Sequence, residues 1–142
     1  MGSILLVESD PETRDRLGTA LRDVGHEVII AVTTREAFLR VSEGGIDIVV
    51  VDAHDPRRGT VELARSLNTL PDAPPIVLVS GSPHAPEISA RIGAVAFLPN
   101  PCESSELVAI VERCVTGSVR PVRVIQDDFG DEDPTGPARQ LG

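Results

Sequence analysis

The chain has 142 residues, of which 41% are hydrophobic and 2% aromatic, so it fits one domain with an aliphatic core and a short appendage. Its formal net charge is −9, and all 13 of its Lys and Arg residues are arginine. This acidic balance argues against a nucleic-acid partner, because such proteins gather basic side chains against phosphates.

The ends of the chain and its cysteines predict a cytoplasmic protein without a membrane segment. The first residues, MGSILLVESD, contain neither the basic segment nor the long apolar run of a signal peptide. No window approaches the roughly 20 apolar residues of a membrane span. Cys102 and Cys114 lie at opposite ends of one predicted helix, too far apart to bridge, and are expected to be reduced thiols.

The chain begins with a predicted strand and a predicted helix. Ile4–Val7 is an uninterrupted apolar run, as in a strand that is buried on both faces. Asp10-Pro11 predicts the N-cap and the first residue of a helix that Gly25 ends. The apolar residues of this helix recur at the spacing of a core-facing surface: Leu17, Ala20, Leu21 and Val24.

The next two strands are predicted at Val28–Ala31 and Ile46–Val51. Between them, Thr34 is expected to cap a short helix that ends at Gly44-Gly45. Ile46–Val51 is the most β-branched segment and is therefore predicted to be the central strand. A loop, Asp52–Gly59, follows it.

The second half of the chain repeats this alternation. Thr60 is expected to cap a helix whose apolar positions run to Leu70, and Ile76–Val79 is the predicted fourth strand. A loop that holds Pro83 and Pro86 leads to a short helix. This helix is predicted to end near Gly93. A strand at Ala94–Leu98 and a helix at Glu103–Val115 complete the prediction.

Five such strand–helix units predict an α/β fold: a doubly wound, five-stranded parallel sheet with helices on both faces. In that class a binding site lies beyond the carboxyl ends of the strands. The domain is expected to span residues 2–116. Residues 117–142, rich in Gly, Pro, Asp and Glu, are predicted to form a disordered tail, because they bury too little apolar surface to offset the entropy of ordering.

Motifs at the predicted strand ends resemble the receiver domain of bacterial response regulators. ILLVESDP resembles the family's first strand and acidic loop, and DIVVVDAHDP its third strand with the acceptor aspartate. PPIVLVSG resembles the fourth strand with its switch hydroxyl, and GAVAFLPNP the segment that normally ends in an aromatic residue and Lys-Pro. The resemblance implies a flavodoxin-like (βα)5 receiver fold and a part in two-component phosphorelay signalling, without enzymatic activity.

The resemblance also implies roles for individual residues. Asp52 matches the aspartate that accepts a phosphoryl group from a histidine kinase or a phosphotransfer protein. Ser80 and Phe97 match the hydroxyl and aromatic switch residues that respond to it. Glu8, Asp52 and the backbone carbonyl of His54 match the protein ligands of Mg²⁺.

Two positions depart from the family pattern. Ser9 stands where the family has a second acid, and Asn100 stands where it has a lysine. Mg²⁺ binding is therefore expected to be weak or absent, since this ion prefers carboxylate ligands. The missing cation is expected to slow phosphoryl transfer. By family analogy, the bond before Pro101 is expected to be cis.

Two hypotheses about function follow and stay open. In the first, a single-domain, atypical response regulator carries phosphate on Asp52 and signals to a downstream protein. In the second, a pseudo-receiver binds its partners without phosphorylation. Either protein is expected to dock, or to form a homodimer, through the face made by the helix that ends near Gly93, the strand Ala94–Leu98 and the helix Glu103–Val115.

Overall fold

Residues 2–116 are the part of the chain that the structure, a computed structural model, describes. The strands are β1 (Ser3–Val7), β2 (Glu27–Ala31), β3 (Ile48–Asp52), β4 (Ile76–Ser80) and β5 (Ala96–Pro99). The helices are α1 (Pro11–Asp23), α2 (Thr34–Ser42), α3 (Thr60–Leu67), α4 (Ala85–Ile92) and α5 (Ser104–Val115). The predicted tail, residues 117–142, lies outside the described residues.

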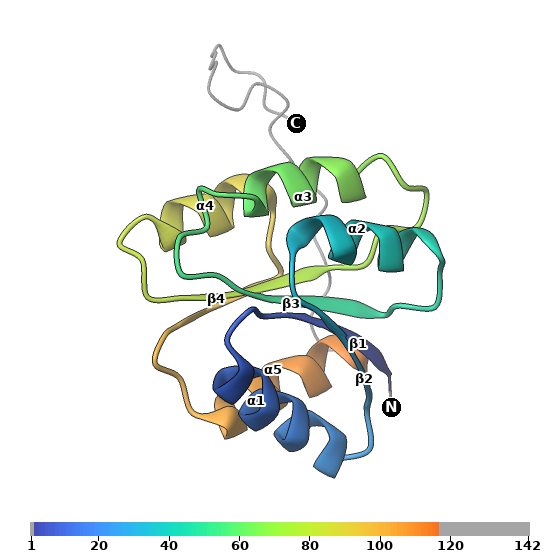
Figure 1. Ribbon diagram of the computed structural model, residues 1–142, viewed down its shortest axis with the longest axis vertical. Helices are drawn as coiled ribbons and strands as arrows, with labels where there is room; N and C mark the ends of the chain where they lie inside the picture. The colour runs from blue at the N-terminus through green and yellow to red at the C-terminus, as the bar shows by residue number, and fades with distance from the viewer. Residues whose placement is uncertain (1, 117–142) are drawn as a thin grey trace.

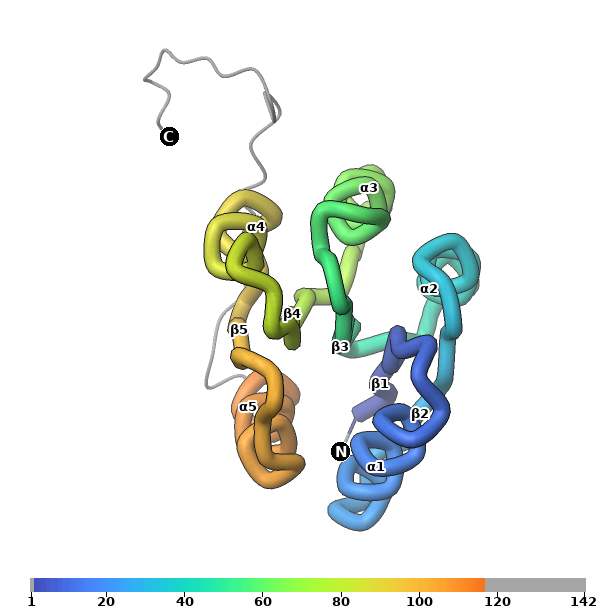
Figure 2. Tube along the Cα trace, turned by 60° about the vertical axis from the view of Figure 1, so that its left-hand side comes forward, coloured from blue at the N-terminus to red at the C-terminus, as the bar shows by residue number. Residues whose placement is uncertain are grey.

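The strands form one parallel sheet in the order β2-β1-β3-β4-β5, so β3 is central, as predicted. Helices α1 and α5 cover one face, and α2, α3 and α4 cover the other (Figure 1 and Figure 2). The predicted doubly wound α/β class is confirmed. None of the helices in residues 2–116 has both the length and the apolar character needed to cross a membrane.

The sheet supplies two apolar cores because successive side chains of a strand point to opposite faces. Ile4 and Leu6 of β1 pack with the cluster under α1 and α5. Leu5 and Val7 pack with the cluster under α2, α3 and α4. Burying each such side chain contributes roughly 1.5–3 kcal/mol. The strand ends are therefore anchored from both sides.

The cysteines near the two ends of α5 are free thiols, as expected. Cys102 is buried just before the helix, and Cys114 is partly buried in its last turn. Burial raises the pKa of both thiols. A raised pKa leaves little thiolate at neutral pH, so neither is an activated nucleophile.

Helix α1 begins as predicted, but α2 is capped one residue earlier than predicted. The Asp10 side chain accepts a hydrogen bond from the Thr13 N–H at 2.9 Å. The N-cap of α2 is Thr33, not Thr34, and its hydroxyl accepts from the Glu36 N–H at 3.1 Å. Thr33 is favoured as the N-cap because it stands three residues before Glu36. At that spacing the Glu36 carboxylate can also accept a hydrogen bond from a backbone N–H before the helix, that of Val32.

The prediction that Thr60 caps α3 is also wrong. Gly59 is the N-cap, with φ of 90°, a conformation that favours glycine. Its N–H donates to Glu62 Oε1 at 3.1 Å, and Thr60 becomes the first helical residue. A Cβ at Gly59 would lie 3.0 Å from Thr34 Oγ1, so glycine also permits the close approach of the starts of α2 and α3.

Strand β3 is shifted toward the carboxyl side of its prediction and ends on Asp52. Asp47 is held by Ser3 instead of pairing as a strand residue: its N–H donates to the Ser3 carbonyl and its carboxylate accepts from the Ser3 N–H, both at 2.8 Å. Asp52 pairs with Val79 of β4. The predicted acceptor is thus a strand residue with a fixed backbone, not part of a loop.

Other boundaries differ for local reasons. Strand β5 begins at Ala96, not at Ala94, because the Ala94 N–H donates to a carbonyl of α4 and so belongs to its end. Helix α3 ends at Leu67, and Leu70 lies in the following turn. Pro86, expected in a loop, occupies the first turn of α4, where a proline has no helical hydrogen bond to lose.

The loops that follow β4 and β5 are held against each other. The Asn100 N–H donates to the Ser80 carbonyl at 3.1 Å. A Cβ at Gly81 would lie only 2.9 Å from the Asn100 carbonyl oxygen. The Asn100-Pro101 bond is cis, as expected from the family resemblance. Glycine at position 81 is therefore needed for this close approach of two backbones.

We expect Gly81→Ala to lower the free energy of unfolding by about 1–3 kcal/mol, because the new methyl group meets backbone that must shift. Gly18→Ala is the matched control. A Cβ there would lie 3.5 Å from Arg22 Nη1, an ordinary van der Waals distance, and alanine in a helix is favoured over glycine by roughly 0.5–1 kcal/mol. Urea unfolding followed by circular dichroism measures both. Equal effects would contradict the proposed contact.

Candidate functional site

A cleft of about 720 Å³ opens at the carboxyl ends of β1, β3, β4 and β5. It lies where the strand order changes direction, between β1 and β3, which is where doubly wound sheets bind ligands. The loops after these strands line it. The lining residues are Glu8, Ser9, Asp10, Thr13, Asp52, His54, Asp55, Arg57, Gly81, Ser82, Pro83, His84, Asn100 and Pro101.

Asp52 and Glu8 are the innermost acids of this cleft. Glu8 is 6% exposed, and its Oε2 accepts from the Asp10 N–H at 2.9 Å. Asp52 Oδ2 is buried and has no hydrogen-bond partner among the described residues. A buried carboxylate oxygen without a partner is costly. The arrangement therefore favours either a protonated Asp52 or a positive group beside it.

The pKa of Asp52 reflects this environment. Burial is the largest cause of its rise to about 7, and two effects of Glu8 add to it: a hydrogen bond that only a protonated carboxyl can make between the two acids, and the negative charge of Glu8. Two adjacent carboxyl groups cannot both ionise at low cost in a partly dry site. A cation beside Asp52 would therefore favour its ionised form near neutral pH.

The two residues that follow Glu8 have different parts in the cleft. Asp10 lines it, but its Oδ2 accepts from both the N–H and the hydroxyl of Thr13, at 2.9 and 2.8 Å. These bonds, with the hydrogen bond from the Thr13 backbone the largest cause, lower the pKa of Asp10. Ser9 is exposed and offers one neutral hydroxyl. Asp10 thus acts as the N-cap of α1, and Ser9 leaves the position of the second acid uncharged.

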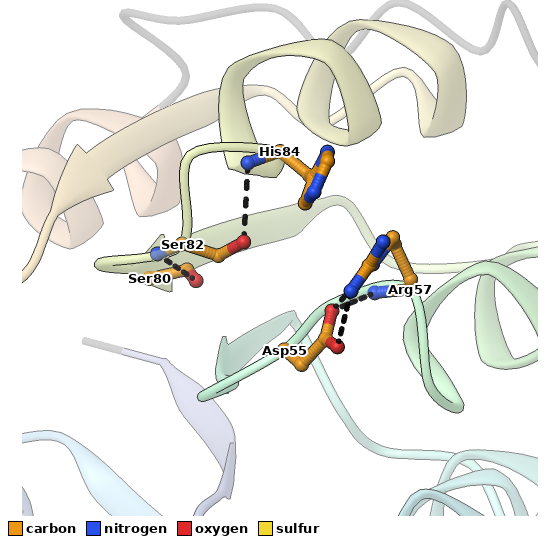
Figure 3. Close-up of polar contacts among 5 residues, drawn as sticks. All are labelled: Asp55, Arg57, Ser80, Ser82 and His84. Carbon is orange, nitrogen blue, oxygen red and sulfur yellow. Dashed lines mark hydrogen bonds and ion pairs between the residues drawn. The ribbon is translucent and has the colours of Figure 1, made fainter.

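The loop after β4 is organised by serine side chains (Figure 3). Ser80 Oγ accepts from the Ser82 N–H, and Ser82 Oγ accepts from the His84 N–H, both at 3.1 Å. Ser80 itself is 1% exposed and is not among the cleft-lining residues. A switch role for Ser80 would therefore require its hydroxyl to turn toward Asp52.

The remaining predicted residues divide between the cleft and the core. His54, Asn100 and Pro101 line the cleft. Phe97 does not: it pairs with Leu78 in the sheet and packs, partly buried, against the core beneath α2, α3 and α4. The predicted roles of these residues stay predictions.

A fork between Asp55 and Arg57 was not anticipated from the sequence. Arg57 donates to the two Asp55 oxygens through Nε at 3.1 Å and Nη2 at 3.0 Å. The side-chain hydrogen bond from Arg57 is the largest cause of the low pKa of Asp55, about 2. His84, which Figure 3 draws together with this pair, lines the same cleft. The Asp-Pro pair was the available signal, since an Asp side chain in a turn accepts the N–H two residues on, as Asp55 Oδ1 does from Arg57 at 3.1 Å.

The residues present fit a magnesium ion only in part. No cluster of three or more His, Cys, Asp or Glu side chains suited to a metal occurs within residues 2–116. The unpartnered Asp52 oxygen and the neighbouring Glu8 carboxyl are nevertheless hard oxygen donors of the kind that this ion prefers. The fit rests on these two carboxyl groups.

Comparison with known proteins identifies the fold family. The sequence matches the family model of the response regulator receiver domain over residues 4–112. The chain belongs to this family. It is 28% identical over 134 residues to the DNA-binding transcriptional regulator NtrC of Rhizobium meliloti, covering 93% of this chain and 28% of that protein. It is 31% identical over 110 residues to the transcriptional regulatory protein CpxR of Escherichia coli, covering 77% and 47%.

This receiver therefore spans less than half the length of those two curated relatives. Among solved structures, it resembles the signal receiver domain of a signal transduction histidine kinase from Syntrophus aciditrophicus, with a TM-score of 0.73 and 27% identity over 89% of this chain and 99% of that one. A response regulator from Thermotoga maritima aligns with a TM-score of 0.70 and 23% identity over 82% and 98%. The second likeness shows the fold alone, and together they confirm the flavodoxin-like receiver architecture.

The raised pKa of Asp52 leads to a stability prediction for the metal-free protein. Ionising this carboxyl costs folding free energy, so its contribution to stability should fall as pH rises from about 3.8 to about 7 and then level off. Asp52→Asn should remove that loss. Because the carboxyl is only partly buried, we expect the variant to be more stable by on the order of 2 kcal/mol at mildly alkaline pH, and by much less at acidic pH.

Urea unfolding across this pH range, in buffer with a chelator, measures the difference. Asp15→Asn removes an exposed carboxylate of α1 and controls for the change in net charge. A stability difference between Asp52→Asn and the parent that does not vary with pH would contradict the burial of an acid at this site.

Proposed function

We propose that this receiver accepts a phosphoryl group on Asp52 and acts as an atypical switch or relay in two-component signalling. The observation that carries the proposal is Asp52 Oδ2, which is buried in the cleft and has no hydrogen-bond partner among residues 2–116. The Asn100 amide and the Ser82 hydroxyl line the same cleft and can donate hydrogen bonds to an anion there.

The proposed step is a direct transfer to the carboxylate. An ionised Asp52 oxygen attacks the phosphorus of a phosphohistidine on a histidine kinase or phosphotransfer protein. A P–O bond forms, the P–N bond breaks, and its electron pair stays on the histidine nitrogen, which takes up a proton from water. Such transfers depend chiefly on positioning and on neutralising the charge of the phosphoryl oxygens.

Mg²⁺ is the cation that the site would use for this neutralisation. Glu8, Asp52 and the backbone carbonyl of His54 would hold it. When bound, the ion would offset the negative charge of the carboxylates and of the phosphoryl oxygens. Binding would be weak because Ser9 contributes no charge.

A phosphorylation-independent pseudo-receiver is the second candidate function. Two observations favour it. Arg57, the arginine that lines the cleft, is already paired with Asp55, and Asn100 carries no charge, so neither side chain offers a free positive charge to a phosphoryl group. In both functions a downstream protein or a second copy of the chain would dock in the cytoplasm on the α4–β5–α5 face, the surface formed by those three elements.

Phosphorylation is tested by incubating the protein with acetyl phosphate and excess Mg²⁺ and recording the intact mass. We expect the mass of one phosphoryl group to be added to the parent protein and to Asp15→Asn, and to be absent from Asp52→Asn. A parent protein that stays unmodified by acetyl phosphate and by a phosphorylated histidine phosphotransfer protein would exclude the acceptor function. The pseudo-receiver would then remain.

Metal binding is tested by restoring an acid beside Glu8. Ser9→Asp is expected to raise the affinity for Mg²⁺ by about tenfold or more, since one added carboxylate near the ion is worth at least ~1.4 kcal/mol in a partly buried site. Titration calorimetry measures the affinity. Ser82→Asp places the same charge on the β4 side of the cleft and should give a smaller gain. Equal gains would indicate a diffuse charge effect instead of a site.

A further inference from the structure

The cleft contains more negative than positive charge, and this poses a physical problem for phosphoryl transfer. Glu8, Asp10, Asp52 and Asp55 line it, while Arg57 is the arginine among the lining residues and is paired with Asp55. The sequence contains no lysine. An incoming phosphoryl group adds further negative charge. A positive group that can reach Asp52 would therefore have a large effect on the rate.

Arg16 of α1 is placed to be that group. Thr13, one helical turn before it, lines the cleft, and residues three apart share a face of a helix. The Arg16 guanidinium donates through Nη1 to Ser104 Oγ at 3.3 Å, across 88 residues of sequence. Ser104 begins α5, directly after the loop that contains Asn100. Arg16 thus reaches the start of α5, the helix that follows the loop in which Asn100 stands at the lysine position.

The charge of Arg16 also acts on the acceptor. The Cys102 thiol, next in the chain to Pro101 of the cleft, indicates this: burial chiefly raises its pKa, the charge of Asp52 adds to the rise, and the charge of Arg16 opposes it. Asp52, Cys102 and Arg16 are therefore within electrostatic reach of one another.

We propose that Arg16 is a charge-compensating residue of the phosphoryl site, supplying from α1 the positive charge that Asn100 in the β5–α5 loop does not. The inference rests on the proposed acceptor function of Asp52. Arg16 is exposed and held by one hydrogen bond to a neutral hydroxyl, so its guanidinium can turn toward the cleft. Exchange of the Ser104 hydroxyl for a phosphoryl oxygen is favourable, because a charge-assisted hydrogen bond is stronger than a bond to a neutral acceptor.

The test compares phosphorylation rates with acetyl phosphate and excess Mg²⁺, read by intact mass. Arg16→Gln keeps a hydrogen-bond donor but loses the charge, and is expected to be slower by about tenfold, in line with a screened charge pair in a partly buried site. Arg16→Lys keeps the charge and should retain most of the rate. Arg14→Gln, a change two residues earlier on the same helix, should stay within about twofold of the parent.

Two further variants separate charge from structure. Asn100→Lys in the Arg16→Gln background should restore the rate, because it returns a cation to the β5–α5 loop. Ser104→Ala removes the hydrogen-bond partner but leaves the guanidinium, so it should not slow the reaction. Thermal unfolding by circular dichroism verifies that all variants fold.

The outcomes distinguish this inference from the proposal on which it rests. A parent protein that is not modified overturns both. A modified parent with Arg16→Gln and Arg14→Gln equally fast overturns the role of Arg16 alone. Slow reaction in Arg16→Gln, Arg16→Lys and Ser104→Ala together, without rescue by Asn100→Lys, would assign Arg16 to structural support of α1 and α5 and so would also overturn it.

Discussion

The adjacent carboxyl groups of Asp52 and Glu8 are the constraint on which the cleft depends. The fold places them at neighbouring strand ends, mostly out of water, so that Glu8 raises the cost of ionising Asp52. The surrounding groups lower this cost only in part. The Asp10 N–H satisfies one Glu8 oxygen, while Asp52 Oδ2 has no partner in the described part of the chain. A site of this kind is poised to take up positive charge.

The two apolar cores offset the cost of placing the Asp52 and Glu8 carboxyl groups next to each other. β1 and β3 are buried on both faces, and their side chains are anchored by helices from either side. The carboxyl ends of these strands, and the two acids on them, are therefore held side by side. The loops after β4 and β5 add a second restraint, because the Gly81 and Asn100 backbones are in close contact. Apolar packing and these backbone contacts, rather than favourable local charge, hold the acids in place.

The two departures from the receiver pattern are linked through charge. Ser9 removes one negative charge and Asn100 removes one positive charge, so the formal charge of this group of residues is unchanged by the pair of differences. The unphosphorylated site can thus keep the same net charge as the receiver pattern. Phosphorylation changes this net charge, because it adds negative charge and the β5–α5 loop has no cation to offset it. Arg16, which reaches the start of α5 from α1, is the side chain that we propose to supply this positive charge.

The order of elements, the parallel sheet and the acids at its carboxyl edge were predictable, because apolar runs and helical spacing are local patterns and the ends of parallel strands share one edge. The sequence by itself thus determined that Glu8, Asp52 and Asn100 would lie at the same edge of the sheet. Local signals of similar strength were ambiguous, as with Thr33 and Thr34, where the placement of Glu36 decided the cap. Only the tertiary structure decided that Asp52 Oδ2 is buried without a hydrogen-bond partner in residues 2–116, that Gly81 approaches the Asn100 carbonyl and that Arg16 reaches Ser104. These contacts join segments far apart in the chain, and their geometry depends on how loops and helices pack, which no periodic pattern in the sequence encodes.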